Sequence, residues 1–246
     1  MLHGSGPGAT GWSNFAAQVE HLSDRFRVIA VDMPGWGKSD PVTYEERDHR
    51  KAAIDFLDEL GIEKAAFVGN SMGGGTSLKV AACHPDRVTH LITLGSGAAG
   101  VKLFGAGDGP TEGLKLLQAA YRDAGIEQMQ KFIDIFCYDA KFRTPELAKQ
   151  RSDNALAHPE HLKNFVDGIG KPRRGSATEE EIAGITAPTL LIHGRDDRVV
   201  HYENSLRLVS LIPNSRLVLL NRCGHWAQVE HADEFNRLLG DFLTNA

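Results

Sequence analysis

The chain has 246 residues, of which 41% are hydrophobic and 24% charged, and its formal net charge is -5. This composition is typical of a globular protein with one large domain or two small ones, and it excludes disordered, collagen-like and coiled-coil chains. No run of about 18 apolar residues occurs, so we expect no membrane span. The acidic balance disfavours nucleic acid or anionic lipid as a partner.

The three cysteines have no paired spacing, which indicates a reducing compartment rather than a disulfide framework. The opening segment Met1–Gly4 has neither the basic nor the apolar stretch of a signal peptide. We therefore expect a cytoplasmic protein.

Short apolar segments alternate with helical patterns along both ends of the chain. In chain order the sequence predicts a glycine-rich loop over 4–11, a helix over 13–22, a strand over 27–31, a helix around 54–60, a strand over 65–68, a helix ending before Pro85, a strand over 88–94, strands over 189–193 and 216–220, and helices over 205–211 and 233–242. Between about 97 and 170 the apolar spacing is helical throughout. This pattern predicts an α/β fold, in which a mostly parallel sheet has helices on both faces.

The all-helical stretch predicts a cap inserted over the carboxyl edge of the sheet, where such sheets bind ligands. We expect a first core part over 1–96, the helical cap over 97–175 and a second core part over 176–246. The segment Lys171–Gly175 could act as a hinge, although a solvated basic loop explains it more simply.

The segment Gly69-Asn70-Ser71-Met72-Gly73 follows a buried strand and precedes a helix. This is the setting of a nucleophile elbow, where a tight turn exposes the serine hydroxyl above the sheet. The glycines would be required because larger side chains clash in so tight a turn. The alternative is a glycine-rich turn with an idle serine.

A nucleophilic serine needs a base and a carboxylate that orients this base. His225 follows the last predicted strand, and two acids, Asp196 and Asp197, follow the strand before it. The order Ser71, Asp197, His225 is the order expected for an α/β-hydrolase. We favour Asp197 because it lies further from Gly194 and can turn back toward the histidine, whereas Asp196 would cap the loop or face solvent.

An oxyanion hole should combine the backbone N–H of Met72 with one from the loop over 3–8, where Gly6 is the expected donor with Ser5 beside it. The segment Gly4–Ala9 formally fits a dinucleotide fingerprint, but no strand precedes it and Pro7 lacks an N–H. No His-x₃-His or Cys-x₂-Cys pair occurs, so we predict neither a metal site nor a cofactor.

These motifs occur together in one known family. The chain resembles the meta-cleavage product hydrolases, the carbon–carbon bond hydrolases of bacterial aromatic and steroid ring degradation. It is most similar in motifs to the branch that acts on phenylpropionate-derived products, the 2-hydroxy-6-oxonona-2,4-dienedioate hydrolases. The resemblance covers almost the whole chain and is carried by Leu2–Gly8 with Trp12–Asn14, Pro34–Asp40, Gly69–Gly74, Pro110–Gly113, Gly194–Arg198 and Cys223–Glu230.

The resemblance implies a substrate of the 2-hydroxy-6-oxo-hexa-2,4-dienoate type. Water cleaves its C5–C6 bond and gives 2-hydroxypenta-2,4-dienoate and a carboxylic acid. By position, the resemblance makes Ser71, Asp197 and His225 the catalytic triad. Four further residues would hold the dienoate end: Asn14, Asn70, Arg151 and Trp226.

The chemistry of this reaction suits those residue types. A carboxylate and an enol oxygen call for a cation and amide donors. The enol must first become a ketone so that the departing carbon leaves as a stabilised dienolate, a proton transfer that His225 and the dienoate pocket would handle. Ser71, or a water activated with its help, then attacks the C6 ketone, and both routes stay open. Equally, the arginine could lie on the surface, the asparagines in turns and the tryptophan in the core.

The chain departs from the family pattern in three places. Further strands normally precede the first glycine loop, and the missing one would lie between the strands that end near Asp32 and Gly69. Its absence would leave unpaired backbone groups, so we expect lower stability than in a version extended upstream. Lys141 replaces a small polar residue, and it could bind a second acid group of the substrate or point to solvent. His193 replaces the usual tryptophan before Gly194, which we interpret as a packing variation.

Two other functions would use the same residues: a carboxylesterase, and a non-catalytic ligand receptor. Asn14, Arg151 and Trp226 favour the carbon–carbon hydrolase, because a simple ester needs no carboxylate clamp. The expected partner is a small-molecule dienoate, with the group on C6 left open. Since relatives are dimers or larger, the resemblance also implies a homodimer or a higher homo-oligomer.

Overall fold

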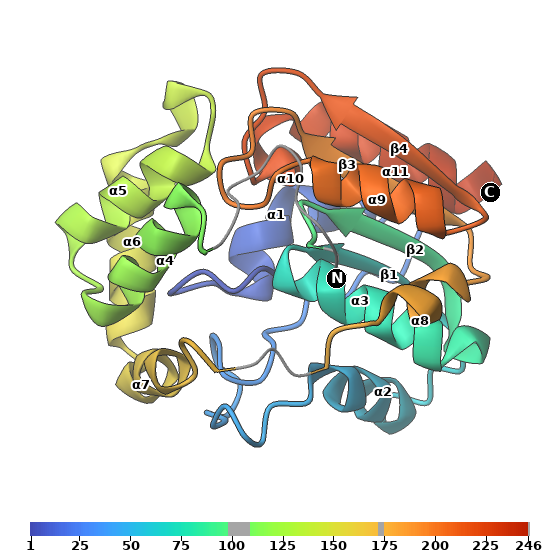
Figure 1. Ribbon diagram of the computed structural model, residues 1–246, viewed down its shortest axis with the longest axis horizontal. Helices are drawn as coiled ribbons and strands as arrows, with labels where there is room; N and C mark the ends of the chain where they lie inside the picture. Colours follow the sequence, from blue (N-terminus) through green and yellow to red (C-terminus); the bar gives the residue numbers. More distant parts are fainter. Residues whose placement is uncertain (98–108, 172–174, 246) are drawn as a thin grey trace.

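The central sheet has four parallel strands within the residues that this computed structural model describes, 1–97, 109–171 and 175–245. Their order is β1 (Ala65–Asn70), β2 (Val88–Leu94), β3 (Thr189–Gly194) and β4 (Ser215–Leu220) (Figure 1). Asn70 lies opposite Leu94, and Gly194 lies opposite Leu220. The carboxyl ends of the strands therefore meet at one edge. The α/β class and these four predicted strands are confirmed.

Helices cover both faces of the sheet, as the alternation of elements predicts. One core cluster joins Leu91 and Leu191 to α2, α3, α8 and α9, and another joins Ile92 and Leu190 to α1 and α11. Neighbouring residues of a strand point to opposite faces, so the two clusters lie on opposite sides of the sheet. The bounds are α1 (Gly11–Leu22), α2 (His49–Glu59), α3 (Met72–Cys83), α8 (Glu179–Ala183), α9 (Glu203–Leu211), α10 (Ala227–Glu230) and α11 (Ala232–Asn245), with a 3₁₀ turn η1 at Pro85–Arg87.

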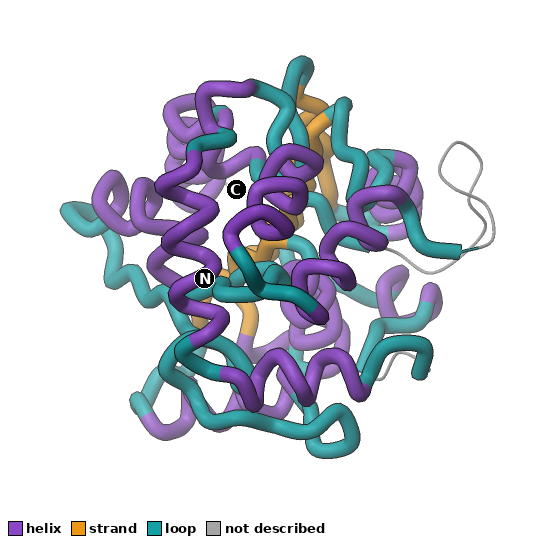
Figure 2. The backbone as a smooth tube through the Cα atoms, turned by 90° about the vertical axis from the view of Figure 1, so that its left-hand side faces the viewer, coloured by secondary structure: helices purple, strands orange, loops and turns teal. Residues whose placement is uncertain are grey.

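Four further helices form a separate layer beside the carboxyl edge of the sheet (Figures 1 and 2). They are α4 (Glu112–Arg122), α5 (Ile126–Phe136), α6 (Pro145–Leu156) and α7 (Pro159–Asp167), with a 3₁₀ turn η2 at Ala140–Phe142. They share an apolar cluster that includes Phe132 and Ile133 and also takes in Val199 and Trp226 from the loops after β3 and β4. The predicted ends of the cap adjoin 98–108 and 172–174, and most of the hinge expected at 171–175 falls on the latter; both segments lie outside the described residues.

The strand predicted over 27–31 is wrong: this segment forms no strand, although Val31 makes an isolated bridge to Leu2 and the Ile29 carbonyl accepts a hydrogen bond from the Met1 amino group at 2.7 Å. Leu2 also bridges to Gly69, so the short segment Met1–His3 lies between residue 31 and β1, where the missing central strand was expected. Residues 27–31 thus meet Met1 and Leu2 through separate contacts rather than through a continuous ladder. An apolar groove of about 730 Å³ is lined by this segment and by Ala65–Val68 of β1.

Local signals explain where the helices next to the site begin. Thr10 caps α1, because its hydroxyl accepts a hydrogen bond from the backbone N–H of Ser13 at 2.9 Å. The helix therefore starts at Gly11, two residues before the predicted start. Helix α3 starts at Met72, directly after the predicted nucleophile Ser71.

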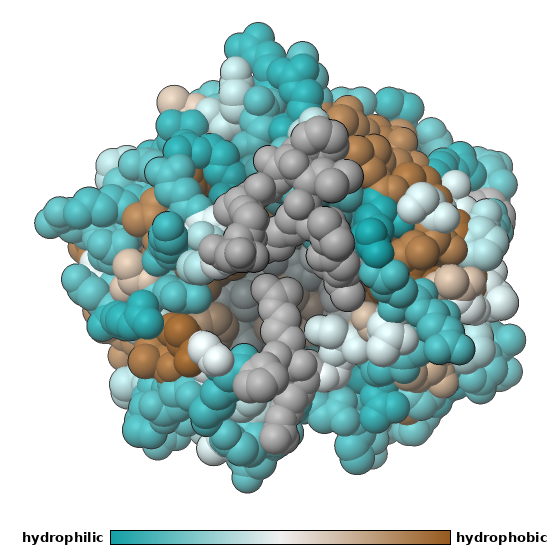
Figure 3. All heavy atoms as spheres, viewed as in Figure 1, coloured by the Kyte–Doolittle hydropathy of each residue, from teal (hydrophilic) through white to brown (hydrophobic). Residues whose placement is uncertain are grey.

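The face of the molecule seen in Figure 3 is mostly hydrophilic where it is coloured, with separate apolar patches. Among the described residues, no helix combines the length and the apolar character needed to cross a membrane. All three cysteines are free thiols.

Candidate active site

Ser71 occupies a strained turn between β1 and α3. Its backbone has φ 53° and ψ -112°, and its N–H donates to the Leu94 carbonyl of β2 at 2.8 Å. A positive φ is unfavourable for a residue with a side chain, and strain of this kind costs about 1–3 kcal/mol and is concentrated at functional sites. The flanking residues have no room for a Cβ: one on Gly69 would collide with the Gly73 carbonyl, and one on Gly73 with the Leu2 carbonyl. The turn thus requires the glycines, as the sequence predicts.

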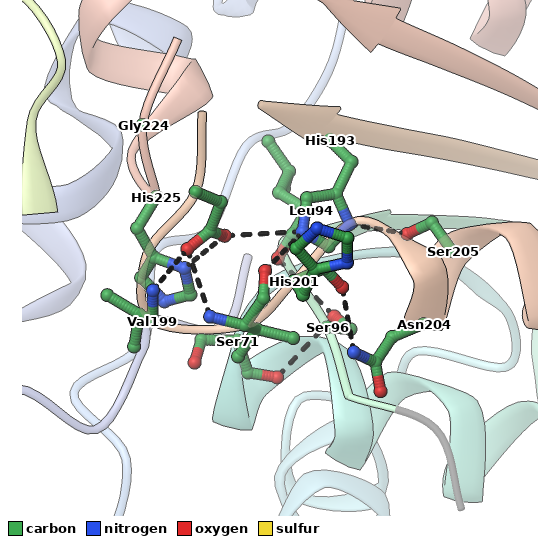
Figure 4. Close-up of polar contacts among 12 residues, drawn as sticks. Ser71, Leu94, Ser96, His193, Val199, His201, Asn204, Ser205, Gly224 and His225 are labelled. Atoms are coloured by element: carbon green, nitrogen blue, oxygen red, sulfur yellow. Dashed lines mark hydrogen bonds and ion pairs between the residues drawn. The ribbon is translucent and has the colours of Figure 1, made fainter. Parts of the chain in front are cut away.

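The acid next to His225 is Asp197. Its Oδ2 accepts a hydrogen bond from His225 Nδ1 at 2.7 Å, and its Oδ1 accepts from the backbone N–H groups of Val199 and Val200 at 2.8 and 2.9 Å (Figure 4). Asp196 instead lies beside Arg195, 3.9 Å from its guanidinium. The bond from Nδ1 fixes the ring so that Nε2 is the nitrogen left for proton exchange.

The ionisation of Asp197 is set by opposing effects. Burial opposes ionisation, but the charge that His225 can carry, together with hydrogen bonds from His193 and His225, outweighs it and holds the pKa of Asp197 well below its usual range. Asp197 is therefore a carboxylate at neutral pH and can stabilise a protonated His225.

The loop that carries His225 is tied to the cap through Glu230. One carboxylate oxygen of Glu230 accepts from Gly224 N at 2.8 Å, and the other accepts from the N–H groups of Tyr138 and Asp139 at 2.7 and 2.8 Å. The N–H of His225 also donates to the Phe136 carbonyl at 2.7 Å. Burial raises the pKa of Glu230. Sequence reasoning missed Glu230, because nothing in the pattern separates it from a surface acid of α10.

A small pocket collects most of the predicted site residues. Its lining residues are Gly4, Ser5, Gly6, Asn14, Asn70, Ser71, Leu117, Phe136, Arg151, His225 and Trp226. They come from the first glycine loop, the turn after β1, the loop after β4 and the cap helices. Segments that are far apart in the sequence thus meet around Ser71.

Arg151 is the unusual member of this pocket. It is 3% exposed, and its guanidinium lies over the Trp226 ring, 4.9 Å from the centroid. Nη1 is 3.5 Å from the Pro7 carbonyl, and Nε has no hydrogen-bond partner among the residues described. Burial lowers the pKa of Arg151 to about 10, so it is still charged at neutral pH. Within the described ranges no carboxylate forms an ion pair with it, which leaves the guanidinium able to pair with an anion.

The two asparagines line the pocket in different ways. Asn70 donates through Nδ2 to the carbonyls of Leu94 and His225, both at 3.3 Å, while its buried Oδ1 has no partner. Asn14 directs Nδ2 to the Thr10 carbonyl at 3.1 Å. Asn70 therefore offers an unused acceptor, whereas Asn14 already uses a donor within its own helix.

The predicted oxyanion donors lie on two sides of Ser71. Met72 is the first residue of α3, whose first backbone N–H groups have no partner within the helix. The glycine loop is held in place by the cap, because Tyr121 Oη donates to the Ser5 carbonyl at 2.7 Å. A Cβ on Gly6 would lie 2.9 Å from Phe132 Cζ, so this position accepts only glycine without a shift.

Lys141 is not brought into the pocket. Its side chain is 66% exposed and its Nζ lies 3.4 Å from Asp139. Of the two roles considered for it, the solvent-facing one agrees with this position. Among the described residues, no group of three His, Cys, Asp or Glu side chains could hold a metal ion.

Comparisons with known proteins agree with this architecture. The family described as alpha/beta hydrolase fold matches residues 1–232. The 2-hydroxy-6-oxononadienedioate/2-hydroxy-6-oxononatrienedioate hydrolase of Cupriavidus pinatubonensis strain JMP 134 is 47% identical over 250 residues, covering 100% of this chain and 86% of the relative. The hydrolase of the same description from Paraburkholderia xenovorans strain LB400 is 43% identical with the same coverage.

Among solved structures, a meta-cleavage product hydrolase from Pseudomonas fluorescens IP01 has a TM-score of 0.88 and 35% identity, covering 99% of this chain and 89% of that one. The 2-hydroxy-6-oxo-6-phenylhexa-2,4-dienoate hydrolase from Rhodococcus sp. strain RHA1 has a TM-score of 0.85 and 27% identity, with coverages of 99% and 89%.

Proposed function

This chain belongs to the α/β-hydrolase family and, within it, to the meta-cleavage product hydrolases, and we propose that it cleaves the C5–C6 bond of a 2-hydroxy-6-oxo-hexa-2,4-dienoate. The products are 2-hydroxypenta-2,4-dienoate and a carboxylic acid. One observation carries this proposal above a simple esterase: Arg151 is a buried cation without an acid partner among the described residues, in the same pocket as Ser71 and His225. A dienoate carboxylate supplies that partner, whereas an uncharged ester does not.

In the proposed reaction Arg151 holds the dienoate carboxylate and Trp226 supports the guanidinium from its other side. Asn70 Oδ1 accepts a hydrogen bond from the 2-hydroxyl group, and Asn14 closes the same end of the pocket. The 2-hydroxyl proton is lost and C5 gains a proton, so that the enol becomes a ketone. Cleavage can then place the electron pair of the C5–C6 bond on a conjugated dienolate.

Ser71, Asp197 and His225 act as the triad. His225 takes a proton from the Ser71 hydroxyl, or from a water molecule positioned by it, as the oxygen adds to the C6 ketone. The backbone N–H groups of Met72 and Gly6, with Ser5 beside them, stabilise the oxyanion. The C5–C6 bond breaks, the dienolate leaves, and one water molecule is consumed in the whole reaction.

The family relatives suggest the group on C6. Two hydrolases that are 43% and 47% identical to this chain are named for a nonadienedioate and a nonatrienedioate, and the ending dioate denotes a second carboxylate. We therefore favour 2-hydroxy-6-oxonona-2,4-dienedioate, a nine-carbon diacid whose hydrolysis leaves a four-carbon diacid beside the dienoate. The free thiols of all three cysteines support a cytoplasmic location, and membership of the family supports a homodimer or a higher homo-oligomer.

The test is spectroscopic. The purified chain is mixed with dienoates that carry phenyl, alkyl or carboxyalkyl groups on C6, and loss of the yellow dienolate absorbance is followed beside hydrolysis of p-nitrophenyl acetate. We expect turnover of the dienoates, fastest with the carboxyalkyl group. Turnover of the ester alone would establish the carboxylesterase instead. Binding of a dienoate without turnover of either compound would establish the receptor.

A further inference from the structure

Figure 4 shows His193 beside Ser205 of α9, and the His193 ring also lies against the carboxylate of Asp197. His193 is the fifth residue of β3, it is 0% exposed, and its Nε2 is 3.2 Å from Asp197 Oδ2, the same oxygen that accepts from His225. We propose that His193 is a positioning residue for the catalytic acid, which acts by donating a second hydrogen bond to Asp197 Oδ2. This inference rests on the proposed triad for the role of Asp197 and identifies a residue that sets its geometry and charge.

The hydrogen-bond partners of His193 determine which ring nitrogen donates. Nε2 is 2.8 Å from the Val200 carbonyl, which can only accept, so Nε2 must carry a hydrogen. The Val200 carbonyl is the nearer acceptor of this hydrogen, and Asp197 Oδ2, 3.2 Å from the same nitrogen, is the second acceptor within reach. Nδ1 is 2.6 Å from Ser205 Oγ of α9, a hydroxyl that can donate to a neutral ring or accept from a charged one. In either protonation state of the ring, Nε2 is a donor.

These contacts correct the interpretation of His193 as a packing variation. A side chain that served only for packing would need no polar partners, whereas both ring nitrogens of His193 have polar partners within 2.8 Å. Ser205 anchors one side of the ring from α9, and Val200 anchors the other from the loop that carries Asp197. The ring is thus clamped between a helix and that loop, which fixes the position of the carboxylate.

The second donor, His193, also reduces the negative charge that Asp197 presents to His225. Oδ1 is occupied by two backbone N–H groups, so Oδ2 alone faces the histidines. When Oδ2 accepts from His193 as well as His225, less of its negative charge is available to stabilise protonated His225. The titratable groups that face Asp197 are His225, His193 and the buried thiol of Cys223, whose pKa is raised by burial and by neighbouring acids that include Asp197.

The experiment replaces the donor and then restores it. In His193→Phe the ring is kept and the donor is lost, and in His193→Gln the side-chain amide can again donate to Asp197. For His193→Phe we expect kcat to fall about tenfold, with KM changed less than about twofold, because the residue is not among those that line the pocket. The acidic limb of the kcat/KM profile should move up by about half a pH unit to one unit. His193→Gln should return the limb toward its wild-type position.

Thr189→Val is the matched control. Thr189 is 1% exposed on the same strand, β3, and its hydroxyl bonds only to the nearby Ala187 carbonyl, at the end of the strand remote from the site. This variant loses one buried hydrogen bond on β3 without touching Asp197. We expect a lower melting temperature but an unchanged pH profile and an unchanged kcat.

A readout without substrate separates this inference from the proposed function. The Nδ1–H proton of His225 should give a low-field NMR resonance that moves further downfield in His193→Phe, since Oδ2 then accepts from His225 alone. Failure of the wild type to turn over dienoates would overturn the proposed function and leave this resonance as the test. A His193→Phe variant that keeps the wild-type resonance and pH profile, while melting lower like the control, would overturn the positioning role.

Discussion

The two sides of the candidate pocket differ in how their buried polar atoms are paired. On the acid side, each oxygen of Asp197 faces two donors: Val199 and Val200 at Oδ1, and His225 and His193 at Oδ2. On the clamp side, formed by Arg151 and Asn70, the buried atoms Arg151 Nε and Asn70 Oδ1 have no hydrogen-bond partner in the part of the chain that the structure describes.

This difference separates positioning from recognition. Leaving a buried polar atom unpaired costs about 1–3 kcal/mol, and more for a charged group, so an unpaired atom that lines a pocket is an open position for a ligand or a water molecule. The fully paired acid side holds the reacting groups still before substrate arrives. The unpaired clamp side is less stable by itself, and in the proposed function it gains its partners when the dienoate binds.

The largest effect should follow from removing the Ser71 hydroxyl. We expect Ser71→Ala to lower kcat by up to about 10⁶-fold, because triad members act as a unit. The dienoate should still bind with nearly unchanged affinity, since the clamp is intact, and stopped-flow absorbance measures both quantities. Retention of more than about one per cent of kcat would contradict a triad that acts as a unit.

The acid side is tested by Asp197→Asn, which keeps the shape of the side chain and removes its charge. We expect kcat to fall by about 10⁴-fold, because the base is no longer held in its working tautomer. Stability should fall as well, by about 2–3 kcal/mol in urea unfolding, since an amide cannot accept from all four donors. Asp196→Asn is the control, and it should keep kcat within about threefold because this side chain does not contact His225.

The clamp side is tested by Arg151→Leu, which should separate the effect on activity from the effect on stability. We expect kcat/KM for the dienoate to fall about 10²–10³-fold, the value of a charge-assisted contact in a buried site. Turnover of p-nitrophenyl acetate should change much less. The free energy of unfolding should stay level or rise, because leucine removes a buried charge that has no acid partner.

Lys141→Ala is the matched control for this substitution, since it removes an exposed cation from the same cap. Its kcat/KM should match the wild type for every dienoate. If Arg151→Leu lowered stability as much as Asp197→Asn does, the contrast between a paired and an unpaired side would be wrong.

Much of the fold and of the candidate site can be predicted from the sequence, because the features concerned have local causes. The turn at Ser71 has a local cause, the glycines on either side, so a pattern of five residues predicts it. The four strands of the sheet are buried apolar runs, which makes them visible to hydrophobic periodicity. The pocket residues Arg151 and Trp226 were predicted through the family resemblance rather than from their own surroundings.

Other features depend on contacts between distant segments and left no local signal. The apolar run at 27–31 has strand character, but a strand also needs a partner, and Leu2 alone provides one bridge. The role of Glu230 depends on backbone groups some 90 residues away, at Tyr138 and Asp139. His193 looks like any buried residue of β3 until Asp197 and Ser205 are placed beside its ring.

The smallest effect, and the finest test of the paired side, is the dependence of stability on pH. The pKa of Asp197 in the folded protein lies below its ordinary value of about 3.9, so the folded state binds fewer protons than the unfolded state in acid. Its contribution is therefore complete above about pH 5 and is lost as the pH falls below about 4. The difference in unfolding free energy between wild type and Asp197→Asn should shrink by about 2 kcal/mol between pH 5 and pH 2.

The difference in unfolding free energy between wild type and Arg151→Leu should stay constant over the same pH range, because the arginine remains charged throughout. Urea unfolding at each pH measures both differences in unfolding free energy. If the difference between wild type and Asp197→Asn did not become smaller in acid, the four donors would not be stabilising the Asp197 carboxylate.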